Sequence, residues 1–180
     1  REDYLRFQST ACQTIVDGRG TGRVVESLIP SNKKDLMLRP ARKEDVYIYY
    51  DWVNDPVVRT NALNSEYISL ETHMTWFDKS LSDSDTFMFV LELQGLPVGQ
   101  VRFELQEDEA IINYSLDQLV RGRGWGSELV SLGARMLDNI RPSVIQARVK
   151  SENKPSAAIF MRLGFDEQLL AGGVRIFRLP

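Results

Sequence analysis

The chain has 180 residues, of which 43% are apolar and 26% are charged, a composition typical of one globular domain or of one domain with an appendage. Its net charge of −3 at pH 7 argues against a nucleic-acid partner held by bulk electrostatics. No apolar run approaches the roughly 20 residues that span a bilayer, so we expect a soluble protein with no membrane partner.

The chain holds one cysteine, Cys12, and one histidine, His73. A lone cysteine forms no internal disulfide, which favours a reducing compartment such as the cytoplasm. The two side chains lie far apart in the sequence and have no carboxylates at ligand spacing. The pattern therefore predicts no metal site.

The sequence pattern of residues 1–34 differs from that of the rest of the chain. A short strand is expected at 14–16, a turn-rich loop at 17–22 and a helix at 23–29, followed by a polar linker. One strand and one helix bury too little surface to be stable alone. We therefore expect residues 1–34 to be the end of a preceding domain plus a linker, and residues 35–180 to be a second domain. Because the first residue is Arg1 and not methionine, we expect a piece of a longer protein.

From Leu36 onward the hydrophobic pattern is continuous and predicts a mixed α/β domain built on a mixed sheet. Strands are expected at 36–40, 86–92, 97–105, 110–116, 144–149 and 174–179, and helices at 45–52, 70–81, from Gly124 onward, and at 154–163. A polar loop is expected at 60–66.

The loop after the strand at 110–116 is the most informative segment. Gly122, Gly124 and Gly126 lie between this strand and the next helix. Free backbone N–H groups at a helix start attract anions, and glycines let a phosphate come close. Arg121 and Arg123 add positive charge where a pyrophosphate would bind. The alternative is a surface turn with solvated arginines. A second glycine-rich loop, at 18–22, follows only a very short strand, and we interpret it as a turn.

The pattern of Arg121, Gly124 and Gly126 resembles the cofactor loop of the GNAT superfamily of acyl-CoA-dependent N-acyltransferases. Residues 151–165 are similar to that family's strand-end asparagine (Asn153), helix and terminal Gly-Phe pair. The element order matches as well, and the resemblance covers residues 36–180.

The resemblance implies a GNAT fold with a splayed central sheet and acetyl-CoA as cosubstrate. The pantetheine arm would lie in the gap between splayed strands, and a backbone N–H near Ser115 or Leu116 would polarise the thioester carbonyl. The cofactor-binding residues implied in this way are Ser115, Leu116, Arg121, Gly122, Arg123, Gly124, Gly126, Ser127 and Asn153.

Phe160 departs from the family pattern, because many members have a tyrosine four residues before the glycine of the Gly-Phe pair. That tyrosine can protonate the departing thiolate, and phenylalanine has no proton to give. Either another group protonates the sulfur, or coenzyme A leaves as the thiolate, or the domain has lost activity.

The first two helices and their loop form the acceptor side in GNAT folds. The residues expected there are Trp52, Asn54, Arg59 and Trp76. A histidine side chain ordinarily changes its charge near neutral pH, so His73 is a candidate general base. A helix-packing histidine beside Trp76 is the simpler interpretation.

Three segments resemble GNAT proteins that acetylate UDP-linked amino sugars in the pseudaminic acid pathway. They are the Trp-x-Asn-Asp-Pro motif that begins at Trp52, the His-x-x-Trp motif that begins at His73, and Gly99 to Phe103. Residues 15–25 resemble the C-terminal end of that pathway's UDP-sugar hydrolases. We therefore expect transfer of acetyl to the 4-amino group of a UDP-linked amino-deoxy sugar, in a chain fused to such a hydrolase. Two alternatives stay open: a ribosomal-protein type N-terminal acetyltransferase, and a non-catalytic acyl-CoA-binding domain.

Overall fold

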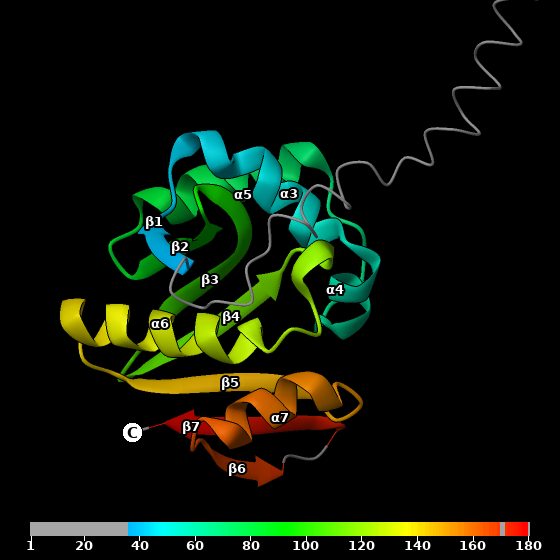
Figure 1. The fold of residues 1–180 in the computed structure, drawn as a ribbon, viewed down its shortest axis with the longest axis vertical. Helices are drawn as coiled ribbons and strands as arrows, with labels where there is room; N and C mark the ends of the chain where they lie inside the picture. The colour runs from blue at the N-terminus through cyan, green and yellow to red at the C-terminus, as the bar shows by residue number, and fades with distance from the viewer. Residues whose placement is uncertain (1–35, 170–171, 180) are drawn as a thin grey trace, which may run out of the picture. The chain divides into compact units, whose positions relative to one another are not determined.

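The computed structural model describes residues 36–169 and 172–179 (Figure 1). The strand expected at 14–16, the loop at 17–22, the helix at 23–29 and the proposed domain boundary at residue 34 lie outside the described residues. The fold is reported from Leu36 onward.

The described elements follow the predicted order, with most boundaries shifted by one or two residues. They are β1 (Leu36–Pro40), η2 (Lys43–Asp45), α3 (Val46–Asn54), α4 (Pro56–Asn61), α5 (Leu70–Ser82), β2 (Thr86–Leu93), β3 (Leu96–Gln106), β4 (Glu109–Leu116), η3 (Gln118–Val120), α6 (Trp125–Ile140), β5 (Val144–Lys150), α7 (Lys154–Arg162), β6 (Asp166–Leu169) and β7 (Val174–Leu179).

Helix α4 and strand β6 were not predicted from the sequence. Helix α4 begins where the Asp55 side chain accepts the N–H groups of Val57 and Val58, with Pro56 at the first helical position. It takes up the first residues of the segment expected as a loop at 60–66. Strand β6 has only four residues and no alternating pattern, and it forms by pairing with β7.

The sheet has the strand order β1-β2-β3-β4-β5-β7-β6. All neighbours pair antiparallel except β4 and β5, which are parallel. Chain order and strand order agree up to β5. The helices between Lys43 and Ser82 connect β1 to β2, tight hairpins connect β2 to β3 and β3 to β4, and α6 returns the chain to start a parallel neighbour.

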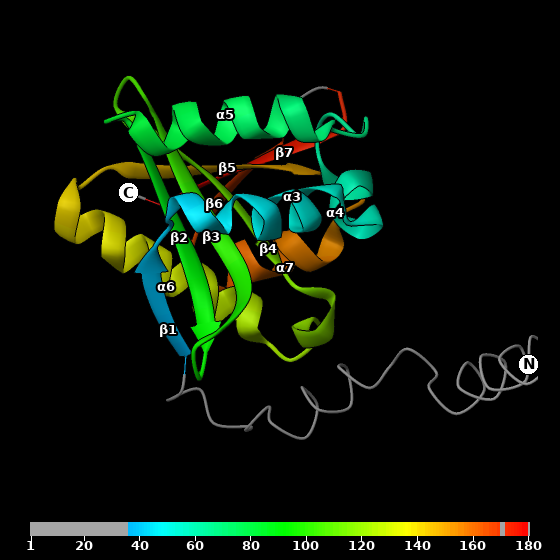
Figure 2. The same cartoon turned by 90° about the horizontal axis from the view of Figure 1, so that it is seen from above.

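Helices cover the two faces of the sheet unequally. On one face Arg102 of β3 lies over the ring of Trp76 in α5, and Tyr49 of α3 packs edge-on against Phe77 of α5. On the opposite face α6 lies so close to β3 that a Cβ on Gly133 would stand 2.9 Å from Val101. Figure 1 shows α3 and α5 above β1–β3 and α6 below them, and Figure 2 shows the same layers from above.

Strands β4 and β5 pair over three residues and then separate. Their register runs from Glu109 opposite Val144 to Ile111 opposite Gln146. Beyond these pairs β4 continues to Leu116 and β5 to Lys150. The two strands diverge toward the right of Figure 1. The predicted splay of the central sheet is confirmed, and we call the gap between residues 112–116 and 147–150 the fork.

Candidate active site

Helix α6 begins beside the open end of β4 without a side-chain cap. Its N-cap residue, Gly124, has φ +78°, a left-handed conformation that favours glycine, and Gly122 has φ +76°. A Cβ at either glycine would meet no atom within 4 Å. The first N–H groups of a helix have no partner within the helix, so this start presents amide donors in open space.

Ser127 adds an unpaired group to this helix start. Its Oγ is buried and has no hydrogen-bond partner. A buried hydroxyl without a partner is costly, and a phosphate oxygen at the helix start would satisfy it. The α6 start therefore fits the phosphate-binding role expected for the loop, and Arg123, which is exposed, is the adjacent cation.

Arg121 binds the protein through two of its guanidinium nitrogens, and its third, Nη2, is buried without a partner among the described residues. Its guanidinium pairs with Asp55 at 2.9 Å, and its Nε donates to the carbonyl oxygen of Leu116 at 2.9 Å. Burial alone would raise the pKa of Asp55, but hydrogen bonds from Arg121 and the α4 backbone hold that pKa below its ordinary value. The positive charge of Arg121 thus joins the glycine loop to the start of α4.

Trp52 makes a second connection between the same two regions. It is buried on α3, and its Nε1 donates to Oδ2 of Asp117 at 3.0 Å. The other oxygen of Asp117 accepts the N–H of Leu119 at the start of η3. The acceptor-side helices and the glycine loop are therefore held together by two polar contacts.

The β4 side of the fork offers backbone donors. Asp117 N–H pairs with the Val98 carbonyl of β3, and alternate residues of a strand point to opposite sides. The N–H groups of Leu116 and Tyr114 consequently face the fork, whereas that of Ser115 faces β3. Of the two positions expected to polarise a thioester carbonyl, Leu116 has the amide with the required direction.

Phe160 lies on α7, which packs over β5 and β7, and Asn153 is the N-cap residue of that helix. The Oδ1 atom of Asn153 accepts the N–H of Ser156 and caps the helix. Phe160 is buried and stacks on Phe177, with ring centroids 5.6 Å apart. The residue in the position of the family tyrosine is therefore part of the core between α7 and β7.

The face of the sheet toward α3 and α5 gives the fork a polar edge. Asn113 and Ser115 of β4 point to this face, as do Arg148 and Lys150 of β5, and we call these four residues the fork rim. The direction follows from the cross-strand pairs, because Asn113 lies opposite Arg102, the residue over Trp76.

The rim is cationic on its β5 side. Arg148 is exposed, and its Nε donates to Gln146 at 2.8 Å. The Nζ of Lys150 donates to the backbone carbonyl of Thr60 at the end of α4. Within the described chain neither cation forms an ion pair with a carboxylate, and none of the four rim residues is acidic.

His73 is buried between α3 and α5. Its Nε2 is 2.9 Å from the carbonyl oxygen of Val46, which can only accept, so this nitrogen carries the proton. Its ring contacts those of Tyr50, Trp76 and Phe77. Burial lowers the pKa of His73. These contacts are those of the helix-packing histidine that was the simpler interpretation.

Asn54 and Arg59 hold the loop before α5. Asn54 exchanges two hydrogen bonds with the backbone of Ile68, and Arg59 donates to the carbonyl oxygens of Asn64 and Glu66. Of the four expected acceptor-side residues, Trp52, Asn54 and Arg59 thus bind the protein itself, while Trp76 supports Arg102 beside the rim.

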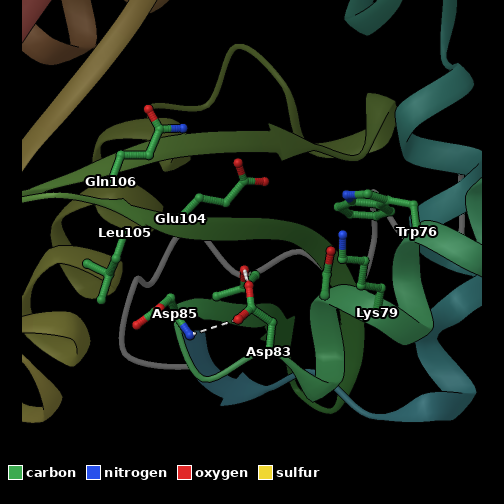
Figure 3. Close-up of a pocket in the computed structure, with 9 residues that line it drawn as sticks. Trp76, Lys79, Asp83, Asp85, Glu104, Leu105 and Gln106 are labelled. Carbon is green, nitrogen blue, oxygen red and sulfur yellow. Dashed lines mark hydrogen bonds between the residues drawn. The ribbon is translucent and has the colours of Figure 1, made fainter.

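A pocket of about 250 Å³ lies between the end of α5 and strands β2 and β3 (Figure 3). Its carboxylates are engaged: Asp83 with Thr86, Asp85 with Arg141 and Glu104 with Arg102. None of the glycine-loop or rim residues lines this pocket, and we assign it no ligand.

Among the described residues, no three His, Cys, Asp or Glu side chains are grouped as a metal would require, and no helix is long and apolar enough to cross a membrane.

Sequence reasoning missed the rim cations, although the signal was present. In the strand at 144–150, apolar Ile145, Ala147 and Val149 alternate with Gln146, Arg148 and Lys150. This alternation predicts one buried and one polar face.

The sequence model of the "Acetyltransferase (GNAT) domain" family matches residues 35–166. The chain belongs to the GNAT acetyltransferase family. This GNAT protein is an acyltransferase, so the alternative of a non-catalytic acyl-CoA-binding domain is not retained.

An uncharacterized N-acetyltransferase of Methanocaldococcus jannaschii is 32% identical over 182 aligned residues, which cover 96% of this chain and 72% of the relative. Among solved structures, spermidine N-acetyltransferase of Vibrio cholerae, in complex with CoA and spermine, superposes with a TM-score of 0.71 at 19% identity, covering 81% of this chain and 94% of the other.

A protein from Salmonella typhimurium that modifies the N-terminal serine of ribosomal protein L7/L12 gives a TM-score of 0.68 at 19% identity, over 84% of this chain and 97% of the other. Identities this low show a shared fold, and relatives with different acceptors share it.

Proposed function

We propose that this GNAT protein transfers acetyl from acetyl-CoA to the 4-amino group of a UDP-linked amino-deoxy sugar. The phosphates of acetyl-CoA would lie at the α6 start, bound by its amides, Ser127 and Arg123. The pantetheine arm would extend into the fork, and the Leu116 N–H would bind the thioester carbonyl as negative charge develops on oxygen. The amine would attack from the rim side.

The cationic rim is the observation that supports this acceptor most directly. Arg148 and Lys150 pair with no carboxylate among residues 36–169 and 172–179, so the diphosphate of a nucleotide sugar would complement them. The same cations lower the pKa of an acceptor ammonium nearby, which increases the fraction of neutral, nucleophilic amine. A polyamine acceptor would instead require carboxylates, and the rim residues include none.

The N-terminal segment supports the same acceptor independently, through the resemblance of residues 15–25 to UDP-sugar hydrolases of the pseudaminic acid pathway. In a fused chain, one domain would work on the same class of nucleotide sugar as the other. The fusion is part of the proposal.

The test is release of coenzyme A thiol from acetyl-CoA in the presence of a UDP-linked 4-amino sugar, spermidine, or a peptide with a free N-terminal serine. We expect turnover with the sugar nucleotide. Turnover with the peptide and none with the sugar nucleotide would favour the N-terminal acetyltransferase and reject the proposal.

A charge control makes the test specific. R148Q/K150Q removes the rim cations, and R162Q removes an exposed cation on α7, which covers the opposite face. We expect the double variant to lose about tenfold or more in kcat/KM for the sugar nucleotide, because hydrogen bonds to charged groups contribute about 1.5–3 kcal/mol each. R162Q should stay within about twofold of the parent protein, as expected for a surface change.

A further inference from the structure

The side chain of Tyr114 crosses the fork. Tyr114 lies on β4 beyond Ile111, the last residue paired with β5, and it faces the same side as its neighbour Val101, toward α6. Its hydroxyl donates to Oγ of Ser156, in the first turn of α7, at 3.0 Å. Because α7 packs over β5 and β7, this hydrogen bond spans from one arm of the fork to the other.

The hydroxyl of Tyr114 stands between the starts of α6 and α7. Cε2 of its ring would be 3.8 Å from a Cβ built on Gly126, in the first turn of α6. The ring meets Phe160 edge-on, with centroids 5.9 Å apart. An extended chain that led from phosphates at the α6 start into the fork would run beside this hydroxyl.

We propose that, when acetyl-CoA is bound, the Tyr114 hydroxyl turns its one proton from Ser156 Oγ to the thioester sulfur and stabilises the thiolate that departs during acetyl transfer. This inference rests on the proposed function in requiring acetyl-CoA in the fork. It gives this chain a phenolic donor beside Phe160, whose own ring has no proton to give.

The amine nitrogen attacks the thioester carbonyl carbon and forms the C–N bond; the C–S bond then breaks, and its electron pair goes to sulfur. The proton of the former amine leaves to water, and the thiolate, held by the Tyr114 hydrogen bond, receives a proton from water. Burial raises the pKa of Tyr114, so the phenol stays protonated and remains a donor at neutral pH.

Two substitutions remove the same hydrogen bond but differ in the proposed donor. Y114F and S156A both break the contact between Tyr114 and Ser156, and only Y114F removes the phenol. We expect similar melting temperatures for the two variants. We expect Y114F to lower kcat by about 10- to 100-fold, the usual range for a group that assists departure, while the KM for acetyl-CoA changes by less than about threefold. S156A should keep kcat within about threefold.

Equal losses of kcat in Y114F and S156A would overturn the proposal, because they would reflect a structural contact alone. Unchanged kcat in Y114F would overturn it as well. Partial recovery of kcat in Y114F/F160Y, which restores a phenol next to the original site, would support it.

A measurement on bound coenzyme A, made without any acceptor, tests the role of Tyr114 separately from the identity of the acceptor. The pKa of the thiol of bound coenzyme A can be followed by the ultraviolet absorbance of the thiolate. A hydrogen bond to the thiolate should lower that pKa by about one unit, and Y114F, but not S156A, should remove this shift. The same pKa in all three proteins would contradict the role of Tyr114, whatever acceptor the enzyme uses. Failure to acetylate a UDP-amino sugar, with the shift intact, would contradict only the acceptor.

Discussion

Gly124 and Gly95 form a matched pair of sites for testing the phosphate-binding role of the α6 start. Their φ angles are +78° and +81°, and a Cβ at either would meet no atom within 4 Å. An L-residue in this conformation costs roughly 1 kcal/mol, and no steric clash adds to that cost. We predict that G124A and G95A each lower the free energy of unfolding by about 1 kcal/mol, and the melting temperature by about 2–4 °C.

The two substitutions should differ in their effect on acetyl-CoA. Gly95 lies in the turn between β2 and β3, whereas Gly124 is the N-cap of α6. A methyl group at Gly124 would occupy the open space at the amide donors, and one lost hydrogen bond to a charged phosphate corresponds to about 1.5–3 kcal/mol. Calorimetric titration should show the dissociation constant rising about 10- to 100-fold in G124A and less than about twofold in G95A. Equal affinities in the two variants would refute this reasoning.

Three further predictions test other parts of the structure. G133A should lower the free energy of unfolding by about 1–3 kcal/mol, because its Cβ would stand 2.9 Å from Val101 and 3.2 Å from Phe103; unchanged denaturation in urea would contradict the close packing of α6. Burial lowers the pKa of His73 below 6.5, so the unfolded chain binds its proton at a higher pH than the folded chain. The resulting stability is complete above pH 6.5 and is lost as pH falls toward the folded pKa, and H73Q should lose less stability than the parent protein between about pH 7.5 and 5.5; equal losses would contradict a buried neutral histidine. D55N should raise the KM of both substrates, because Asp55 joins the glycine loop to α4 through Arg121; unchanged KM values would contradict that coupling.

Local patterns in the sequence were sufficient to predict most of the fold. The alternation at 86–92, 97–105 and 110–116 predicts β2, β3 and β4, and the spacing after Gly124 predicts α6, because each pattern reports burial of one face. Helix α4 was missed although Asp55 and Pro56 are a start signal, since six residues give no helical period. Strand β6 carries no local signal and depends on its partner β7.

The part of the candidate site that depends on local backbone conformation could be predicted from the sequence. The part that depends on contacts between residues far apart in the sequence could not. The glycines of the loop are required by the chain reversal and helix start that they make. The contacts of Arg121 with Asp55 and of Tyr114 with Ser156 join residues 66 and 42 positions apart. Such pairs are set by the way the helices pack on the sheet. For the same reason the pairing of Arg121 with Asp55 was not predicted from the sequence, and the role of Arg121 as a phosphate ligand stays a prediction.

In the proposed function, the cationic fork rim selects an anionic amino-sugar acceptor for acetyl transfer from acetyl-CoA. The most direct measurement is kcat/KM for one 4-amino sugar supplied with and without its UDP group, in the parent protein and in R148Q/K150Q. We expect the parent protein to prefer the UDP-linked sugar strongly and the double variant to lose most of this preference. Equal kcat/KM for the two forms of the sugar in the parent protein, or a preference that survives in the double variant, would contradict this role of the rim.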